Sequence, residues 1–137
     1  MAAIKSKDTK PEIFFRKLLY SRGFRYRKNV SNIPGHPDLY LAKYNTAIFV
    51  HGCFWHRHKN CKYAYIPKSR TEFWNDKFES NIARDKEVLR KLAVKNIKCL
   101  VIWECTIRKM IKSEVILEKI VAETIGFCLS TELYTEV

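Results

Sequence analysis

The sequence predicts a mixed α/β fold in which a short central sheet is flanked by helices and carries a long irregular loop. Segments with the apolar spacing of helices alternate with short segments typical of strands. Only four glycines and four prolines interrupt the chain. One stretch between these segments has no periodicity and is rich in His, Cys and aromatic residues. We expect a single domain over residues 1–137.

The first predicted helix has a clear start. Thr9 is a suitable N-cap, and Glu12 three residues later completes a capping-box pattern. The helix should continue to about Ser21, and Gly23 should stop it. Its core-facing residues are predicted to be Ile13, Phe14, Leu18 and Leu19.

The next segments predict strands. Residues 24–30 alternate apolar and basic side chains, as in a half-exposed strand, and residues 33–37 form a turn. Two paired strands are expected at 39–43 and 46–51, joined through residues 43–45. Residues 52–68 form the irregular loop.

The second half of the chain predicts helix, strand and helix. A long helix is expected from about Arg70 to Lys95, and its apolar stripe is Phe73, Phe78, Ile82, Leu89 and Leu92. The continuous apolar run at 99–103 predicts a buried strand. A final helix is expected over residues 113–125, capped by Ser113.

The composition indicates which partner to expect. The net charge is +12, from 26 Lys and Arg against 14 Asp and Glu, and such a charge favours a nucleic acid over a neutral partner. No membrane span or signal peptide is apparent, so we expect a cytoplasmic, bacterial-type protein. Its five cysteines should then be thiols or metal ligands rather than disulfides.

The irregular loop predicts a zinc site. Cys53, His58 and Cys61 lie within nine positions, and their side chains are typical zinc ligands. Cys105, just after the buried strand, is the candidate fourth ligand. The alternative of ordinary buried cysteines and a surface histidine fits this clustering poorly. Two further cysteines in apolar surroundings are expected in the core: Cys99 and Cys128.

A carboxylate after the turn predicts a magnesium site. Asp38 opens a strand, where a carboxylate can bind a hard cation. The next strand has Phe49 and His51 where many nucleases have an acid and a lysine. Waters, substrate phosphates and backbone carbonyls such as that of Val50 would complete the coordination. Taken alone, Asp38 fits a turn-capping role better than a metal-binding one, and the two histidines and the metal-tethered loop favour the functional role.

Two histidines flank the segment Gly-Cys-Phe-Trp. Imidazoles titrate near neutral pH, so either His51 or His56 can take a proton from water or support a phosphate. Together with Asp38, they predict metal-assisted hydrolysis of a phosphodiester.

The same loop carries large aromatic residues in polar surroundings. Phe54 and Trp55 either fold back onto the core or insert between base pairs, and Trp74 can join them. Nearby basic residues are candidates for phosphate contacts or for a solvated helix face: Lys59, Lys62, Lys68, Arg70, Lys77 and Arg84.

Several motifs together resemble those of the very-short-patch repair endonucleases. They are His51-Gly-Cys-Phe-Trp-His56, Pro34-Gly-His-Pro-Asp38, Arg70-Thr-Glu-Phe-Trp74 and Trp103-Glu-Cys105, within roughly residues 1–110. The resemblance implies a restriction-endonuclease-like fold, a structural zinc, and magnesium-dependent nicking beside the thymine of a T:G mismatch. It implies a monomer that acts on double-stranded DNA at the nucleoid, with other mismatch-repair proteins as partners.

The resemblance also assigns roles to individual residues. Asp38 would hold magnesium, His56 would activate water, and His51 would assist at the phosphate. Glu12 would belong to the outer part of the site. Intercalation would fall to Phe54, Trp55 and Trp74, zinc binding to Cys53, His58, Cys61 and Cys105, and a minor-groove contact to Met1.

Some positions differ from the family pattern. Val50 stands where threonine is common, and His36 where arginine can occur. Family members carry a short basic DNA-clamping segment before the residue matching Met1, where this sequence begins. The rival interpretations are a related nickase or restriction-type endonuclease with another target, a module that binds distorted DNA without cleaving it, and a zinc-bearing structural protein.

Overall fold

The computed structural model describes residues 9–137, so the contact expected of Met1 lies outside the described residues. Its elements are, in chain order, α1 (Lys10–Ser21), β1 (Arg27–Lys28), β2 (Leu39–Leu41), a 3-10 turn η1 (Ala42–Tyr44), β3 (Thr46–His51), α2 (Thr71–Val94), β4 (Lys98–Trp103), α3 (Glu104–Lys112), α4 (Glu114–Leu129) and β5 (Tyr134–Glu136).

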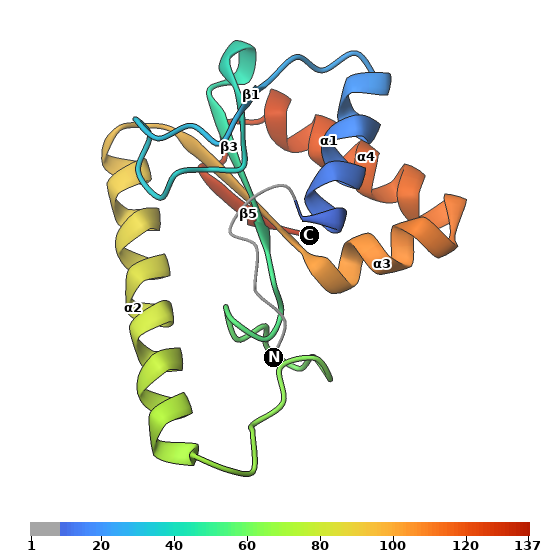
Figure 1. Cartoon of the computed structure of the whole chain (residues 1–137). Helices are drawn as coiled ribbons and strands as arrows, with labels where there is room; N and C mark the ends of the chain where they lie inside the picture. Colours follow the sequence, from blue (N-terminus) through green and yellow to red (C-terminus); the bar gives the residue numbers. More distant parts are fainter. Residues whose placement is uncertain (1–8) are drawn as a thin grey trace.

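Within the described residues, five strands form one mixed sheet in the order β1-β2-β3-β4-β5. The β1–β2 and β2–β3 pairs are antiparallel, whereas β3, β4 and β5 run parallel. The parallel β3–β4 pair needs a crossover, which includes α2. Helix α2 covers one face of the sheet, and α1, α3 and α4 lie on the other (Figure 1). The predicted mixed α/β class and the predicted β2–β3 pair are therefore confirmed.

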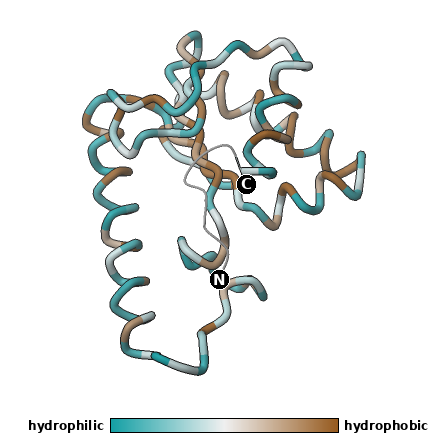
Figure 2. The backbone as a smooth tube through the Cα atoms, viewed as in Figure 1, coloured by the Kyte–Doolittle hydropathy of each residue, from teal (hydrophilic) through white to brown (hydrophobic). Residues whose placement is uncertain are grey.

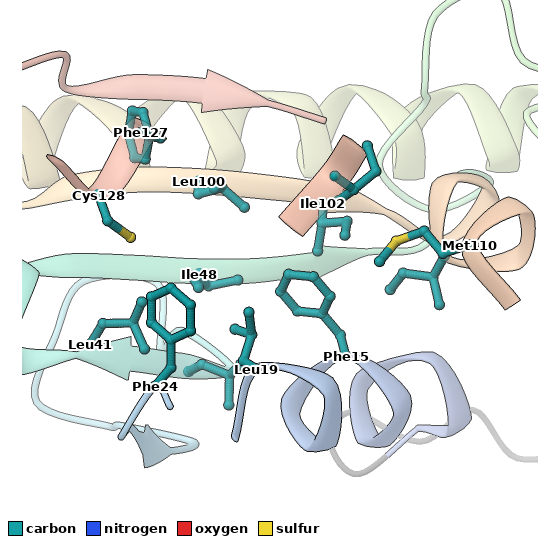
Figure 3. Close-up of a cluster of buried hydrophobic side chains, with 13 residues drawn as sticks. Phe15, Leu19, Phe24, Leu41, Ile48, Leu100, Ile102, Met110, Phe127 and Cys128 are labelled. Atoms are coloured by element: carbon teal, nitrogen blue, oxygen red, sulfur yellow. The ribbon is translucent and has the colours of Figure 1, made fainter. Parts of the chain in front are cut away.

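Alternate side chains of β3 and β4 fill two apolar clusters. Ile48, Leu100 and Ile102 point toward Phe15 and Leu19 of α1 (Figure 3). The alternate residues of the same two strands face α2 and form a second cluster with its Leu92. These strand residues are Ala47, Phe49, Val101 and Trp103. Hydrophobic positions accordingly gather along the central strands, while much of α2 is hydrophilic (Figure 2). No helix in residues 9–137 is both long and apolar enough to cross a membrane.

Helix α1 starts and stops as predicted, but its buried face is shifted. The capping box at its start is present, and Gly23 follows its end with a positive φ of 92°. Phe15 and Leu19 are buried together with the carboxylate of Glu12. The remaining predicted core residues are only partly buried: Ile13, Phe14 and Leu18. A pattern based on apolar residues misses a face that includes an acid.

Helix α2 has the predicted length, but its apolar stripe is only partly correct. Phe78 and Leu92 are buried, and Leu89 packs against the second cluster. Phe73 and Ile82 are 44% and 38% exposed, contrary to the prediction. The first turns of α2 extend beyond the end of the sheet, beside the loop (Figure 1). Those turns therefore have no sheet to pack against.

The remaining differences lie at weakly patterned segments. Strand β1 has two residues rather than the predicted seven, and β2 ends at Leu41 because η1 begins the turn early. Helix α3 and strand β5 were not predicted. Helix α3 follows β4 without a turn residue between them, and β5 (Tyr-Thr-Glu) lacks an apolar run.

Helix α4 has the predicted Ser113 cap but continues to Leu129, past the predicted end at Ile125. Lys98 at the start of β4 explains where helix α4 ends. The buried Lys98 ammonium donates hydrogen bonds to the carbonyls of Phe127, Cys128 and Ser130. A cation at the carboxyl end of a helix neutralises its unpaired carbonyls.

Candidate active site and metal centre

Four predicted zinc ligands meet at one point beside the end of β4. Cys53, His58 and Cys61 come from the irregular loop, and Cys105 comes from the first turn of α3. Their ligand atoms all lie within 4.8 Å of one another. The Cys105 sulfur is 3.4 Å from His58 Nδ1, and the Cys105 backbone N–H donates to the Cys53 sulfur at 3.4 Å. The structure thus brings together the complete predicted set.

The chemistry of this cluster suits a tetrahedral cation. Two sulfur ligands 2.3 Å from a tetrahedral zinc ion lie roughly 3.8 Å apart, a separation that falls within the 4.8 Å limit for these ligand atoms. Burial lowers the pKa of His58, which keeps its imidazole neutral and its lone pair available. Burial raises the pKa of the Cys53 thiol to about 12 in the absence of a cation. A metal ion would replace the thiol proton and remove this cost.

Arg57 holds the loop from inside, and sequence analysis did not single it out. Its guanidinium donates to the carbonyls of Phe54, Ala64 and Tyr65 and lies 3.9 Å from the centre of the Phe78 ring. An irregular backbone needs partners for its carbonyls, and Arg57 supplies three of them. A single arginine among many basic residues carries no sequence signal for this role.

The predicted hydrolytic residues, with the exception of Glu12, line a separate cavity of about 390 Å³. Asp38 lies just before β2, while Val50 and His51 form the end of β3. His56 reaches the same cavity from the loop, and Asp85 reaches it from α2. Antiparallel pairing of β2 with β3 brings the start of one strand beside the end of the other. The fold therefore gathers residues that are far apart along the chain.

Asp38 is a buried carboxyl group with an unusual pKa. Its Oδ2 accepts a hydrogen bond from the Val50 backbone N–H at 2.7 Å. Burial raises the pKa of Asp38 to about 7; the nearby Glu12 adds to the rise, while the Val50 bond and His56 oppose it. Burying the ionised form of such a carboxyl group is costly unless a nearby cation compensates for its negative charge.

Glu12 leaves a carboxylate oxygen without a hydrogen bond in this region. Its Oε2 accepts from the Thr9 backbone N–H at 3.3 Å, while its Oε1 is buried and has no hydrogen-bond partner in the described residues. The Arg16 guanidinium is 3.9 Å from this Oε1. Two buried carboxylates near each other, one with an oxygen to spare, fit a hard divalent cation.

The two histidines are stacked, and one is fixed by an acid. The ring centroids of His51 and His56 are 3.8 Å apart with an interplanar angle of 4°. His56 Nδ1 is 2.8 Å from Asp85 Oδ2, so the Nδ1–H donates a hydrogen bond to the carboxylate and the lone pair of the neutral ring is on Nε2. Burial lowers the pKa of His51 to about 3, which keeps this ring neutral.

Asp85 is the site residue that sequence analysis missed. It follows Arg84 and precedes Lys86 on a charged helix, where the pattern indicates a solvated face. Only the packing of α2 across the sheet brings it to His56, 29 residues away along the chain.

The predicted intercalating residues form an aromatic cluster beside the metal ligands. Trp55 and Trp74 have ring centroids 5.7 Å apart, and Phe54 is 5.0 Å from Trp55 and 5.6 Å from Trp74. Tyr65, which was not predicted, lies 5.0 Å from Phe54. These rings border a second cavity, of about 450 Å³, which Arg108 also lines.

Of the six basic candidates, Arg84 lines the hydrolytic cavity, and the other five line neither cavity. Lys68 and Arg70 are exposed residues at the end of the loop, and neither lines the hydrolytic cavity. The Arg70 guanidinium lies 4.4 Å from the centre of the Phe73 ring. Both residues lie just before α2, whose first turn carries Trp74 of the aromatic cluster.

Comparison with known proteins identifies the class of this enzyme. The family described as DNA mismatch endonuclease Vsr matches residues 1–63. The chain is 46% identical to the type II nicking enzyme V.NmeAIP of Neisseria meningitidis over 108 residues, which are 79% of this chain and 76% of that protein. It is 41% identical to the type II nicking enzyme V.XorIIP of Xanthomonas oryzae, over 77% of this chain and 76% of that protein.

A further relative is the DNA mismatch endonuclease Vsr of Escherichia coli, 38% identical over 108 residues, 79% of this chain and 69% of that protein. With the α/β fold and the cavity of carboxylates and histidines, these matches define the protein as an endodeoxyribonuclease. It belongs to the Vsr family of DNA mismatch endonucleases.

Proposed function

We propose that this enzyme nicks one strand of duplex DNA beside the thymine of a T:G mismatch, in very-short-patch repair. The cavity that joins Asp38 to the His56–Asp85 pair is the observation that carries the hydrolytic part. Family membership supports mismatched DNA as the substrate. The chain would act as one restriction-endonuclease-like domain, as a monomer on nucleoid DNA in the cytoplasm, beside other mismatch-repair proteins.

His56 is the base in this proposal. Its Nε2 takes a proton from water while its Nδ1–H stays hydrogen-bonded to the Asp85 carboxylate, which stabilises the imidazolium that forms. The water oxygen bonds to phosphorus, and the bond from phosphorus to the leaving oxygen breaks. His51, kept neutral by burial, donates a ring N–H to the phosphate.

Asp38 is proposed to hold magnesium, with the Val50 carbonyl, waters and DNA phosphate oxygens as further ligands. Glu12 forms the outer edge of this site, and its buried unbonded oxygen supports a cation there. When bound, magnesium supplies positive charge that stabilises the charge developing on the phosphate. The second ion is proposed to be structural zinc, held by Cys53, His58, Cys61 and Cys105.

Recognition of the mismatch is proposed to use the aromatic cluster. Phe54, Trp55 and Trp74 would insert beside the mismatched pair, and unstacking costs least where pairing is already weak. Lys68 and Arg70 would contact phosphates beside this cluster, and Met1 would contact the minor groove.

A second candidate is a nickase of the same family with a different target. It is favoured by the name "type II nicking enzyme" that several relatives carry. Both candidates share the same hydrolytic chemistry and differ only in the duplex that is cut. The experiment below separates them.

The test is a magnesium-dependent nicking assay on labelled duplexes that differ at one pair: T:G, T:A, C:G and T opposite a gap. We expect a single-strand break beside the thymine of T:G only, and none with Asp38→Asn, which should still bind DNA. Equal nicking of T:G and T:A would refute mismatch selectivity. Binding without a break in the wild type would instead support a non-cleaving DNA-binding module.

A further inference from the structure

Trp103 joins the metal cluster to the hydrolytic cavity. It is the last residue of β4 and pairs in register with His51 of β3. Its ring stacks on that of His58, with centroids 4.1 Å apart and an angle of 9°. Its ring also meets His51 nearly at right angles, with centroids 5.4 Å apart. One buried indole therefore contacts a ligand of the cluster and a histidine of the cavity.

Glu136 of the C-terminal strand holds this indole. The Trp103 Nε1–H donates to Glu136 Oε1 at 3.2 Å, and the Tyr134 hydroxyl donates to Glu136 Oε2 at 2.6 Å. Tyr134 itself lines the hydrolytic cavity. Trp103 is 8% exposed whereas Glu136 is exposed, so without this carboxylate the buried indole must turn for its N–H to reach another acceptor or water. A buried indole N–H without an acceptor is unfavourable, which drives the ring to turn.

We propose that Glu136 is a positioning residue for hydrolysis: through the Trp103 indole it sets the orientation of the His51 ring. Strand β5 is then part of the catalytic framework as well as the edge of the sheet. The inference rests on the proposed role of His51 in hydrolysis. A misplacement of about 1 Å can lower a rate about a hundredfold, so a turned indole is enough to affect cleavage.

The test compares Glu136→Ala with Glu136→Gln, whose side-chain oxygen can still accept from Trp103. Glu132→Ala is the matched control because it removes an exposed carboxylate from the same segment. Single-turnover nicking is measured on whichever duplex the wild type cuts, so failure of T:G selectivity leaves this test intact. We expect the single-turnover rate constant at saturation to fall at least about tenfold in Glu136→Ala and to recover in Glu136→Gln, with the half-saturating concentration changed less than about twofold.

A double-mutant cycle separates positioning from simple stability. Trp103→Phe keeps a ring but removes the N–H, so combining it with Glu136→Ala should cost little more than Trp103→Phe alone. Melting temperature, metal content and the His51 and His58 ring resonances are measured in parallel. We expect the resonances to move in Glu136→Ala and to return in Glu136→Gln.

Three results would overturn the inference: Glu136→Ala as active as Glu132→Ala, a loss of activity that follows loss of metal or of folded protein, or additive costs in the cycle. If the Glu136 variants nicked DNA as fast as the wild type while His56→Ala was inactive, only the role of Glu136 would be refuted. Full activity in His51→Ala would instead refute the proposed role of His51.

Discussion

The cysteine–histidine cluster and the hydrolytic cavity take residues from the same short segment, but the cluster is compact and the cavity is open. Between residues 51 and 58, Cys53 and His58 turn to the cluster, whereas His51 and His56 turn to the cavity. In the cluster, sulfur and nitrogen ligands gather around one point. In the cavity, carboxylates and imidazoles line a space large enough for part of a substrate. One loop thus supplies two sites of different chemistry.

The difference shows how a closed site and an open site are distinguished. The cluster has four possible ligands within reach of one another, which would complete the coordination of a tetrahedral ion and leave no position for a substrate. The cavity includes Asp38, whose pKa lies near neutrality, and the charge of Glu12, which has a buried oxygen without a hydrogen bond, acts on Asp38. We therefore expect the cluster to serve stability and the cavity to serve chemistry.

The largest effect should come from breaking the cluster. In Cys105→Ala we expect zinc to be lost, the loop to detach from β4, and the melting temperature to fall by more than about 10 °C. Structural zinc can contribute on the order of 10 kcal/mol, comparable with the whole stability of a domain. Metal analysis and thermal unfolding measure this, and nicking should disappear with the loop.

The matched control is Cys128→Ala, which removes a core thiol away from the cluster. It should keep one zinc ion per chain and lose only about 1 to 2 kcal/mol of stability. Unchanged zinc content in Cys105→Ala would show that Cys105 is not a ligand and that the cluster is not closed.

Breaking the cavity should affect rate rather than folding. Asp85→Asn removes the carboxylate that fixes the His56 ring, so we expect nicking to slow by about 10²–10⁴-fold while DNA affinity is kept. Adding His56→Ala should cost little more, because both residues act through one proton transfer. Single-turnover kinetics and DNA binding measure the two effects separately.

Asp76→Asn on the same helix is the control, since Asp76 is exposed and lines neither cavity. It should leave the rate within about twofold of wild type. If Asp85→Asn and Asp76→Asn behaved alike, the hydrogen bond to His56 would have no part in cleavage.

The pH dependence sharpens the contrast further. Asp38 has a raised pKa of about 7 in the folded protein. Between its ordinary pKa and pH 7, folding is therefore accompanied by protonation of this carboxyl group, and the protonated form stabilises the folded state. Without added magnesium, this stabilisation is complete below about pH 4 and is lost as the pH rises to about 7, at up to about 1.4 kcal/mol per unit. Unfolding of wild type and Asp38→Asn, compared at each pH, isolates it.

Magnesium should reverse this dependence because it binds the ionised carboxylate. Below about pH 7 its apparent affinity should fall about tenfold per unit, with a corresponding fall in nicking at low magnesium. A stability difference between wild type and Asp38→Asn that stays constant from pH 5 to pH 8 would contradict the raised pKa.

The two sites were not equally predictable from the sequence. The cluster was predicted in full because three ligands lie close together in a loop and the fourth follows a recognisable buried strand. The cavity was predicted only in part, because Asp85 lies on a charged helix and meets His56 through packing alone. Strand β5, whose Tyr134 lines the cavity, was missed for another reason, because a three-residue edge strand has too little periodicity to detect.

The smallest effect should come from Thr9, which caps α1 and is hydrogen-bonded with Glu12. Thr9→Ala removes the hydroxyl that accepts from the Glu12 backbone N–H, and should cost about 1 kcal/mol. Ser113→Ala removes the matching cap of α4 and should cost a similar amount. The Glu12 charge acts on Asp38, so only Thr9→Ala should also weaken magnesium binding, by a few-fold in a titration of nicking against magnesium. Equal magnesium titrations for the two variants would show that α1 supports the fold without tuning the cavity.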